Sequence, residues 1–216
     1  LCIEQQQTRN MLVVTSSHNA TAERQYRFPN EYGVQKKETT TTTVSAGTGV
    51  LLSDARTQIQ VSGCTLGRII DWHFSDASDM GTAMAPAAFD TLMRHLSLTK
   101  TSLSDYDQIL TGDLSAAGFA LFKDLLQQQG YASLEMLDDC GLLIYDRSRQ
   151  PVFCGGCGSA CAMCVTIAHV FEQMRTGQLD RVLVIATGAL LSPVATFQKQ
   201  SIPCIAHAIE YRRREA

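Results

Sequence analysis

The stretch from Val152 to Leu191 constrains the fold of this chain most strongly. A glycine-rich turn, Cys154–Gly158, leads into Ala160–Phe171, where all but two residues are apolar. A helix that is apolar on every side is typical of a protein interior, because an exposed helix needs a hydrated face. Gly177 is expected to end this helix, and the apolar run Val182–Ala186 predicts a central, parallel strand covered on both faces. The sequence therefore predicts a core made of a glycine turn, a buried helix and a buried strand.

Length and composition are those of an ordinary globular protein. The chain has 216 residues, of which 45% are hydrophobic and 18% charged, and its formal net charge is −3. This length suits one large domain or two small ones, and the negative charge does not favour nucleic acid as a partner. The apolar runs are too short for a membrane span, and the first residues do not resemble a signal peptide. Because the sequence begins with Leu1 and not with Met, we expect a fragment or a processed piece.

Four of the 8 cysteines are closely spaced, at Cys154, Cys157, Cys161 and Cys164. Their pattern, C-x2-C-x3-C-x2-C, is one that a metal cluster can use. The last three would share one side of a helix, however, and buried cysteines pack there as small apolar residues. We therefore predict packing, with neither a metal nor another cofactor, and reduced thiols in an intracellular compartment.

Two segments of the chain show the same order of features. A helix end, a polar turn, an apolar strand and small polar residues occur around Met11–Thr15 and again around Val182–Ala186. Each strand is followed by another, within Thr41–Ser53 in the first segment and at Cys204–Tyr211 in the second. We interpret this order as an internal duplication, in which two similar halves share one covered sheet and the chain begins inside the first half.

Strands alternate with helices between these two segments, which is typical of an α/β protein with a mostly parallel or mixed sheet. We expect residues 1–67 to be the remnant of the first half and residues 68–216 to be the second half. The apolar patterns of the region between the segments predict three strands and two helices, namely Gln58–Leu66, Ala87–Leu98 with Pro86 in its first turn, Gln108–Thr111, Ala116–Gln129 and Gly141–Tyr145.

Small polar residues follow three of the predicted strands. They form the clusters Thr15–Asn19, Thr111–Ser115 and Thr187–Gly188. In sheets of this class the ligand crevice lies beyond the carboxyl ends of the strands. The glycine turn before the buried helix is expected to open toward the same end, where exposed amides at the helix start favour an anion.

Several long motifs resemble those of a known family. A buried helix behind a glycine turn, in duplicated halves, is similar to the thiolase-like fold of condensing enzymes. More specifically, the chain resembles the stage V sporulation protein AD family of spore-forming bacteria over essentially its whole length. The resemblance implies a duplicated α-β-α layered fold, with a mixed five-stranded sheet in the second half and an incomplete first half that lacks about one domain of sequence. The motifs that carry the resemblance are Thr15–Gly33, Asp79–Ala88, Ile109–Ser115, Ala186–Pro193 and Ser201–His207.

The resemblance implies a binding role in the spore. Members of the family bind dipicolinic acid (pyridine-2,6-dicarboxylate) and take part in its movement into the developing spore, together with membrane proteins of the same operon. It also implies a peripheral position on the cytoplasmic face of the spore inner membrane. A homodimer is a further expectation.

The motifs of a thiolase active site are not matched in this chain. Thiolases carry a nucleophilic cysteine at the start of the first buried helix, a position that would precede Leu1. They place a histidine in the second glycine turn, whereas Cys154–Gly158 has none, and a second cysteine where Thr187 and Gly188 stand here. We therefore predict a protein that is not an enzyme. The alternative is a thiolase-like acyltransferase whose nucleophile lies outside this sequence.

The loop after the first strand carries cationic groups and aromatic rings. A planar dicarboxylate needs positive charge, amide donors and an apolar wall. Three residues also have simpler interpretations, because His18 can be structural, the stem of Arg27 can cover apolar surface, and Asp113 can anchor its loop through backbone amides. Asp113 would also repel a dianion. The predicted ligand-binding residues are Ser17, His18, Asn19, Arg24, Arg27, Asp113 and Gly188.

Overall fold

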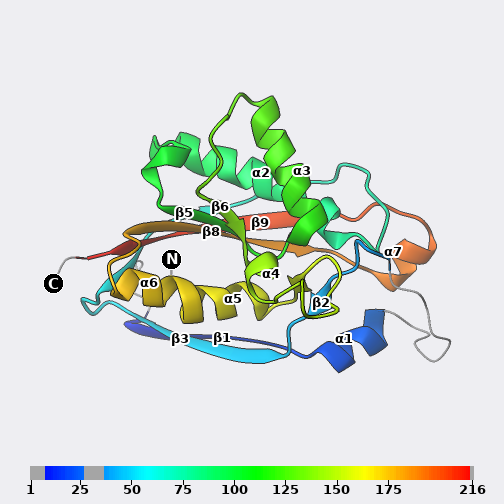
Figure 1. Ribbon diagram of the computed structural model, residues 1–216, viewed down its shortest axis with the longest axis horizontal. Coiled ribbons are helices and arrows are strands. Elements are labelled where there is room, and N and C mark those ends of the chain that lie inside the picture. The colour runs from blue at the N-terminus through cyan, green and yellow to red at the C-terminus, as the bar shows by residue number, and fades with distance from the viewer. Residues whose placement is uncertain (1–7, 27–36, 215–216) are drawn as a thin grey trace.

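The structure is a computed structural model that describes residues 8–26 and 37–214; for residues 23–26 it describes the backbone only. Its main element is a mixed five-stranded sheet (Figure 1). β5 is parallel to both β6 and β8, whereas β9 is antiparallel to β8 and to β4. The strands in spatial order are β4 (Ile59–Leu66), β9 (Cys204–Arg213), β8 (Arg181–Ala189), β5 (Gln108–Thr111) and β6 (Leu137–Asp139).

Helices cover both faces of this sheet. On one face lie α2 (Met80–Thr99) and α3 (Ser115–Gln128), and on the other lies a continuous helical run (Figure 1). Beyond that run, β1 (Asn10–Ser17) and β3 (Ala46–Ser53) form a separate antiparallel pair. The layers therefore alternate as helix, sheet, helix and sheet. The helical run consists of α5 (Cys161–Val165), a π-helical turn η3 (Thr166–Val170) and α6 (Phe171–Arg175).

The alternation of side chains along β8 explains the two hydrophobic cores. Leu183 and Ile185 pack toward α2 and α3, whereas Val182 and Val184 pack toward the helical run. A strand buried on both faces has no polar alternation, and this is why the sequence of β8 is continuously apolar. The predicted central strand is therefore confirmed, with a parallel neighbour on one side and an antiparallel neighbour on the other.

The helical run is buried where it faces the two sheets, but not on every side. Cys161, Val165 and Val170 are buried, but Ala168 and His169 are exposed. The expectation of a helix buried on every side was therefore wrong for the middle of the run. The five-stranded sheet and β3 enclose the helix from two directions and leave a third side open to solvent in the described part of the chain.

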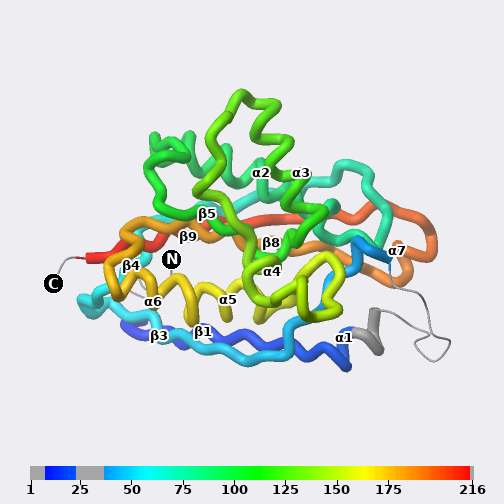
Figure 2. Tube along the Cα trace, viewed as in Figure 1, coloured from blue at the N-terminus to red at the C-terminus, as the bar shows by residue number. Residues whose placement is uncertain are grey.

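The two repeated segments have the same layout. β1 is followed by the short helix α1 (Asn19–Tyr26) and then by the antiparallel strand β3. β8 is followed by α7 (Pro193–Phe197) and then by the antiparallel strand β9. The expectation that the halves share one sheet was wrong, because β1 and β8 belong to different sheets with the helical run between them (Figure 2).

Capping side chains account for two further differences from the sequence prediction. The helix predicted after Pro86 begins earlier, at Met80, because the Asp79 carboxylate accepts a hydrogen bond from the backbone N–H of Thr82. Gly141–Tyr145 is not a strand. It overlaps the helical turn α4 (Cys140–Leu143), where Asp139 caps the N–H of Leu142.

The short elements complete the chain. Three of them are η2 (Leu103–Asp105), β2 (Thr42–Thr43) and β7 (Gly156–Cys157), and the last two pair in parallel. The proposed division between residues 67 and 68 stays a prediction, although β4, which precedes it, pairs with β9 in the five-stranded sheet. None of the helices in the described ranges combines the length and the hydropathy that crossing a bilayer requires.

Candidate functional site

Three strand ends meet at the glycine turn that precedes α5. The Asp113 carboxylate, just after β5, accepts hydrogen bonds from the backbone N–H of Gly158 at 3.0 Å and from Thr187 Oγ1 at 2.8 Å. Ser17 Oγ, at the end of β1, accepts a hydrogen bond from the N–H of Ala160 at 3.3 Å. We refer to Ser17, Asp113, Gly158 and Thr187 as the strand-end cluster. Its position at the carboxyl ends of β1, β5 and β8 is the one that the sequence predicted.

Glycine is required in the turn at two positions. Gly158 has φ +104°, and a Cβ added there would lie 3.0 Å from Thr43 Cγ2 and 3.2 Å from Ser17 Oγ. Gly155 has φ +134°, and a Cβ there would lie 2.7 Å from the carbonyl oxygen of Gly141. Residues other than glycine rarely adopt such backbone angles. The turn is therefore held close to β1 and α4 by backbone geometry as well as by hydrogen bonds.

The amides at the helix start are already engaged. The N–H of Gly158 donates to Asp113 and the N–H of Ala160 donates to Ser17. The expectation that exposed amides here favour an external anion is wrong for these two groups, because a carboxylate and a hydroxyl of the chain itself already accept their hydrogen bonds. Asp113 anchors a backbone amide, as the simpler interpretation held, but the amide belongs to the glycine turn and not to its own loop.

A second carboxylate, Asp139, lies behind the turn and is fully buried, whereas Asp113 is half-buried. It accepts hydrogen bonds from Thr111 Oγ1 at 2.6 Å and from the N–H groups of Leu114 and Ser115, each at 2.9 Å. Burial raises the pKa of Asp139 to about 7, and the nearby charge of Asp113 adds to the rise. Burial also raises the pKa of Asp113, against the effect of its two hydrogen bonds.

Ser115 joins the Asp139 carboxylate to the turn. It is fully buried, has φ +55°, and donates a hydrogen bond through its Oγ to the carbonyl oxygen of Gly156 at 2.8 Å. A non-glycine residue in this conformation is strained unless its surroundings hold it. The N–H of Ser115 bonds to Asp139, so that Asp139, Ser115 and the glycine turn form one connected unit.

Sequence reasoning did not identify Asp139. The apolar pattern of Gly141–Tyr145 suggested a strand, so the preceding aspartates were assigned to no site. The signal that would have identified Asp139 is an aspartate immediately before a short apolar segment, which is a typical helix N-cap. Thr187 was predicted only as part of a polar cluster, yet it contacts Asp113 directly.

Two of the cysteines near the turn are buried thiols with raised pKa values. Cys140 and Cys161 are buried, and burial raises the pKa of both thiols. Cys154 Sγ accepts a hydrogen bond from the N–H of Ala117 at 3.1 Å. Cys157 lies in β7 and not in the helix, so the predicted common helical side was wrong for this residue. Within the described ranges, no group of three potential metal ligands comes together.

Three of the remaining predicted ligand residues, His18, Asn19 and Gly188, lie near the ends of β1 and β8. His18 is exposed, with its Nδ1 3.1 Å from Thr21 Oγ1. The N–H of Asn19 donates to Ser45 Oγ at 2.8 Å, while Asn19 Oδ1 is buried and has no partner in the described part of the chain. Gly188 is half-buried in β8 opposite Ile205. The side chain of Arg24, in α1, and the whole of Arg27 lie outside what the structure describes.

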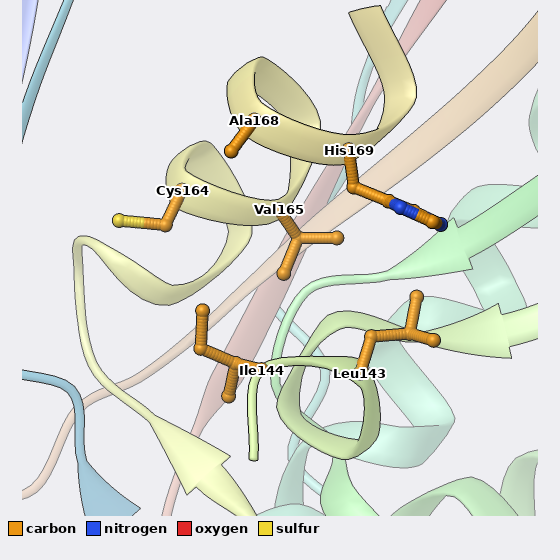
Figure 3. A pocket seen from close by; sticks show the side chains of 6 residues that line it. All are labelled: Leu143, Ile144, Cys164, Val165, Ala168 and His169. Carbon is orange, nitrogen blue, oxygen red and sulfur yellow. The ribbon is translucent and has the colours of Figure 1, made fainter. Parts of the chain in front are cut away.

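A separate cavity of about 190 Å³ lies between α4 and the helical run (Figure 3). Its walls are mostly apolar, with one thiol and one imidazole at the edge. None of the predicted ligand residues lines it, so it is distinct from the strand-end cluster. The residues that line it are Leu143, Ile144, Cys164, Val165, Ala168 and His169.

Comparison with known proteins identifies the family. Residues 1–212 match the family model described as Stage V sporulation protein AD. The chain belongs to the stage V sporulation protein AD family. It is 50% identical over 205 residues to Stage V sporulation protein AD of Bacillus subtilis (strain 168). That alignment covers 95% of this chain and 60% of the relative, so the chain spans about three-fifths of the length of the curated relative that it matches.

Solved structures show that the fold is thiolase-like. The chain is similar to 3-oxoacyl-(acyl carrier protein) synthase III, FabH, from Pseudomonas aeruginosa, with a TM-score of 0.54, 12% identity, and coverage of 99% of this chain and 62% of the other. OleA from Xanthomonas campestris gives a TM-score of 0.53 and 13% identity, with coverage of 96% and 57%. These neighbours are enzymes, whereas the family name is that of a sporulation protein. At such identities the likeness concerns the fold alone.

Proposed function

We propose that this member of the family is a non-catalytic spore protein that binds dipicolinate and aids its uptake into the developing spore. Its membership of a sporulation family supports the biological setting. The observation that carries the proposal is the strand-end cluster, in which two hydroxyls and the Asp113 carboxylate, from three strand ends, converge on the backbone N–H groups of one turn. Convergent polar groups at such a position are typical of small-molecule sites.

The residues around the cluster suit a planar dicarboxylate. The hydroxyl of Thr187 donates to Asp113 and that of Ser17 donates to the carbonyl oxygen of Val44, so a ligand must compete with these bonds. His18 and Asn19 follow directly after β1. Asn19 Oδ1 has no partner in the described part of the chain, so this amide is available to reorient toward a ligand. In this proposal Arg24 and Arg27 supply the positive charge that a dianion requires.

The chemistry of the thiols supports binding without acyl transfer. A cysteine nucleophile must be a thiolate, which requires a neighbouring base or a positive environment. Cys161 stands at the start of α5, yet burial and the nearby Asp113 both raise the pKa of its thiol. An acyltransferase built on this fold would therefore need a nucleophile other than Cys140 or Cys161.

The proposal includes partners on the membrane. We place the protein on the cytoplasmic face of the spore inner membrane, in contact with membrane proteins of the same operon, and a homodimer is part of the same proposal. Exposed apolar side chains support such contacts. Leu12, Val14 and Leu51 lie on the outer face of the β1–β3 pair with about two-thirds of their surface exposed, and Phe197 in α7 is 87% exposed.

Isothermal titration of the full-length protein with dipicolinate tests the binding proposal. We expect binding that His18→Ala weakens and that the exposed control Asp124→Asn, on α3, leaves unchanged. Absence of heat, together with no competition by related pyridine carboxylates, would reject the proposal. Mass spectrometry after incubation with several acyl-CoA thioesters tests the alternative, since a covalent acyl-protein would establish transferase chemistry.

A further inference from the structure

The Asp113 carboxylate carries charge that the described side chains do not balance. Its two hydrogen-bond donors, Gly158 and Thr187, are neutral, and no described lysine, arginine or histidine pairs with it. The titratable groups that face it from the packed elements are Asp139 at the end of β6, Cys140 in α4 and Cys161 in α5. The thiols are neutral, and Asp139 adds negative charge as the pH rises above its pKa of about 7, so the cluster is electrostatically unfavourable for an incoming anion.

A dicarboxylate that binds at this cluster meets a like charge. Like charges in a poorly hydrated site favour protonation of one of the groups. We infer that the binding of dipicolinate is coupled to the uptake of one proton by Asp113. This inference rests on the proposed function and specifies how the same site is regulated.

The hydrogen bonds of Asp113 show where the proton is placed. Oδ2 accepts from the backbone N–H of Gly158, which can only donate. Oδ1 accepts from the hydroxyl of Thr187, which can donate or accept. A proton taken from solvent therefore resides on Oδ1 and donates to Thr187 Oγ1. The hydroxyl hydrogen of Thr187 is then free to donate to a ligand carboxylate.

Protonation thus changes the site in two ways. It removes the charge that repels the dianion, and it turns Thr187 from a partner of Asp113 into a donor for the ligand. The raised pKa of Asp113, caused by burial, brings this protonation closer to neutral pH. The variant Asp113→Asn imitates the protonated state, because the side-chain carbonyl can accept from Gly158 while the side-chain NH2 group donates to Thr187.

Isothermal titration of the full-length protein with dipicolinate, in two buffers of different ionisation enthalpy, counts the protons taken up. The titrations are run from pH 6.5 to pH 8, where the carboxyl groups of the ligand are ionised. We expect close to one proton per ligand and an affinity that falls about tenfold per pH unit above the pKa of Asp113. For Asp113→Asn we expect no proton uptake, no pH dependence, and at pH 8 tighter binding than that of the unmodified protein, by about tenfold for each unit by which the pH exceeds the pKa of Asp113.

Two further variants keep the result interpretable. Thr187→Val retains the shape of the side chain, and we expect it to weaken binding about tenfold while proton uptake persists. Asp124→Asn, exposed on α3, should match the unmodified protein. Binding without proton uptake would overturn this inference and leave the proposed function standing. A third variant, Asp139→Asn, distinguishes the two carboxylates. If proton uptake persists in Asp113→Asn and disappears in Asp139→Asn, then Asp139 takes up the proton, and this inference is overturned. Absence of binding at every pH would overturn both proposals.

Discussion

The pKa of the buried Glu210 carboxylate is lowered, whereas the pKa values of the strand-end carboxylates Asp113 and Asp139 are raised. Glu210 in β9 accepts hydrogen bonds from Arg181 Nη2 at 2.9 Å, Arg212 Nε at 2.7 Å and Ser62 Oγ at 2.7 Å. Burial alone would raise the pKa of Glu210, but these donors outweigh it and lower the pKa to about 2. Asp113 and Asp139 have only neutral donors, and the pKa of each is raised.

We interpret the difference as one between a structural role for Glu210 and the proposed binding role of the strand-end cluster. The Glu210 network joins β4, β8 and β9, and through Tyr106 OH and the buried His95 it also reaches α2. A carboxylate balanced in this way stabilises one arrangement of the fold at neutral pH. The carboxylates at the strand ends lack such balance, and perturbed groups of this kind are concentrated at functional sites.

The largest effect is expected for Glu210→Ala. This change leaves the guanidinium groups of Arg181 and Arg212 without their buried partner, so we expect a loss of about 3–5 kcal/mol in the free energy of unfolding at pH 7. Urea denaturation followed by circular dichroism measures it. A loss below about 1 kcal/mol would show that the network does not stabilise the fold, and that Glu210 does not differ in this respect from Asp113 and Asp139.

Asp139→Asn tests the other side of the comparison. The folded-state pKa of Asp139, about 7, lies above its ordinary value, so the folded protein holds a proton that the unfolded chain has lost. The contribution to stability is present at low pH and is lost as the pH rises toward 7. The advantage of the unmodified protein over the variant should therefore be larger at pH 5 than at pH 8, by about 2–3 kcal/mol.

Chemical denaturation of both proteins at the two pH values gives this difference. Asp124→Asn, at an exposed position in α3, serves as the control and should show the same pH dependence as the unmodified protein. A difference of the opposite sign would mean that Asp139 is ionised throughout and that its four donors dominate over burial.

His95→Gln should have a smaller effect with the reverse pH dependence. His95 is fully buried, and burial lowers the pKa of its imidazole. The unfolded chain takes up a proton near pH 6.5 that the folded protein does not, so stability is lost as the pH falls below that value. We expect a cost of about 1–2 kcal/mol at pH 8, from the lost hydrogen bonds to Thr65 and Tyr106, that shrinks at pH 5. Thermal melts of both proteins at pH 5 and pH 8 measure this cost. A cost that grows on acidification would contradict a lowered pKa for the buried His95.

The smallest effect is expected at an exposed pair. Lys37 Nζ and Asp76 Oδ2 lie 2.8 Å apart, but both side chains are largely exposed. Asp76→Asn should therefore cost at most about 1 kcal/mol, and less in high salt. Denaturation in low and high salt measures the effect. A cost comparable to that of Glu210→Ala would show that burial is not what distinguishes these ion pairs.

The sequence predicted local elements better than it predicted layers. Local apolar patterns located β5, α3 and β8, because each pattern is decided by near neighbours in the chain. Which sheet β1 joins depends on contacts across the helical run, and no local pattern encodes that choice. The strand predicted at Gly141–Tyr145 failed because the capping by Asp139 outweighed a short apolar run.

The candidate site was predictable in outline but not in its connections. Small polar residues near the ends of three predicted strands indicated Ser17, Asp113 and Thr187, although β1 belongs to a different sheet from β5 and β8. The hydrogen bond between Asp113 and Gly158 joins residues 45 positions apart and could not be read from spacing. The balance of charge around Glu210 likewise depends on Ser62, 148 positions away.

The central claim is that dipicolinate binds at the strand-end cluster and not at the cavity between α4 and the helical run. Amide chemical shifts of the isotope-labelled protein, recorded as dipicolinate is added, test this claim most directly. We predict that the largest changes occur at Gly158 and Thr187, and that Val165 and His169 change little. Changes centred on Val165 and His169, or no change at any of these amides, would contradict the claim.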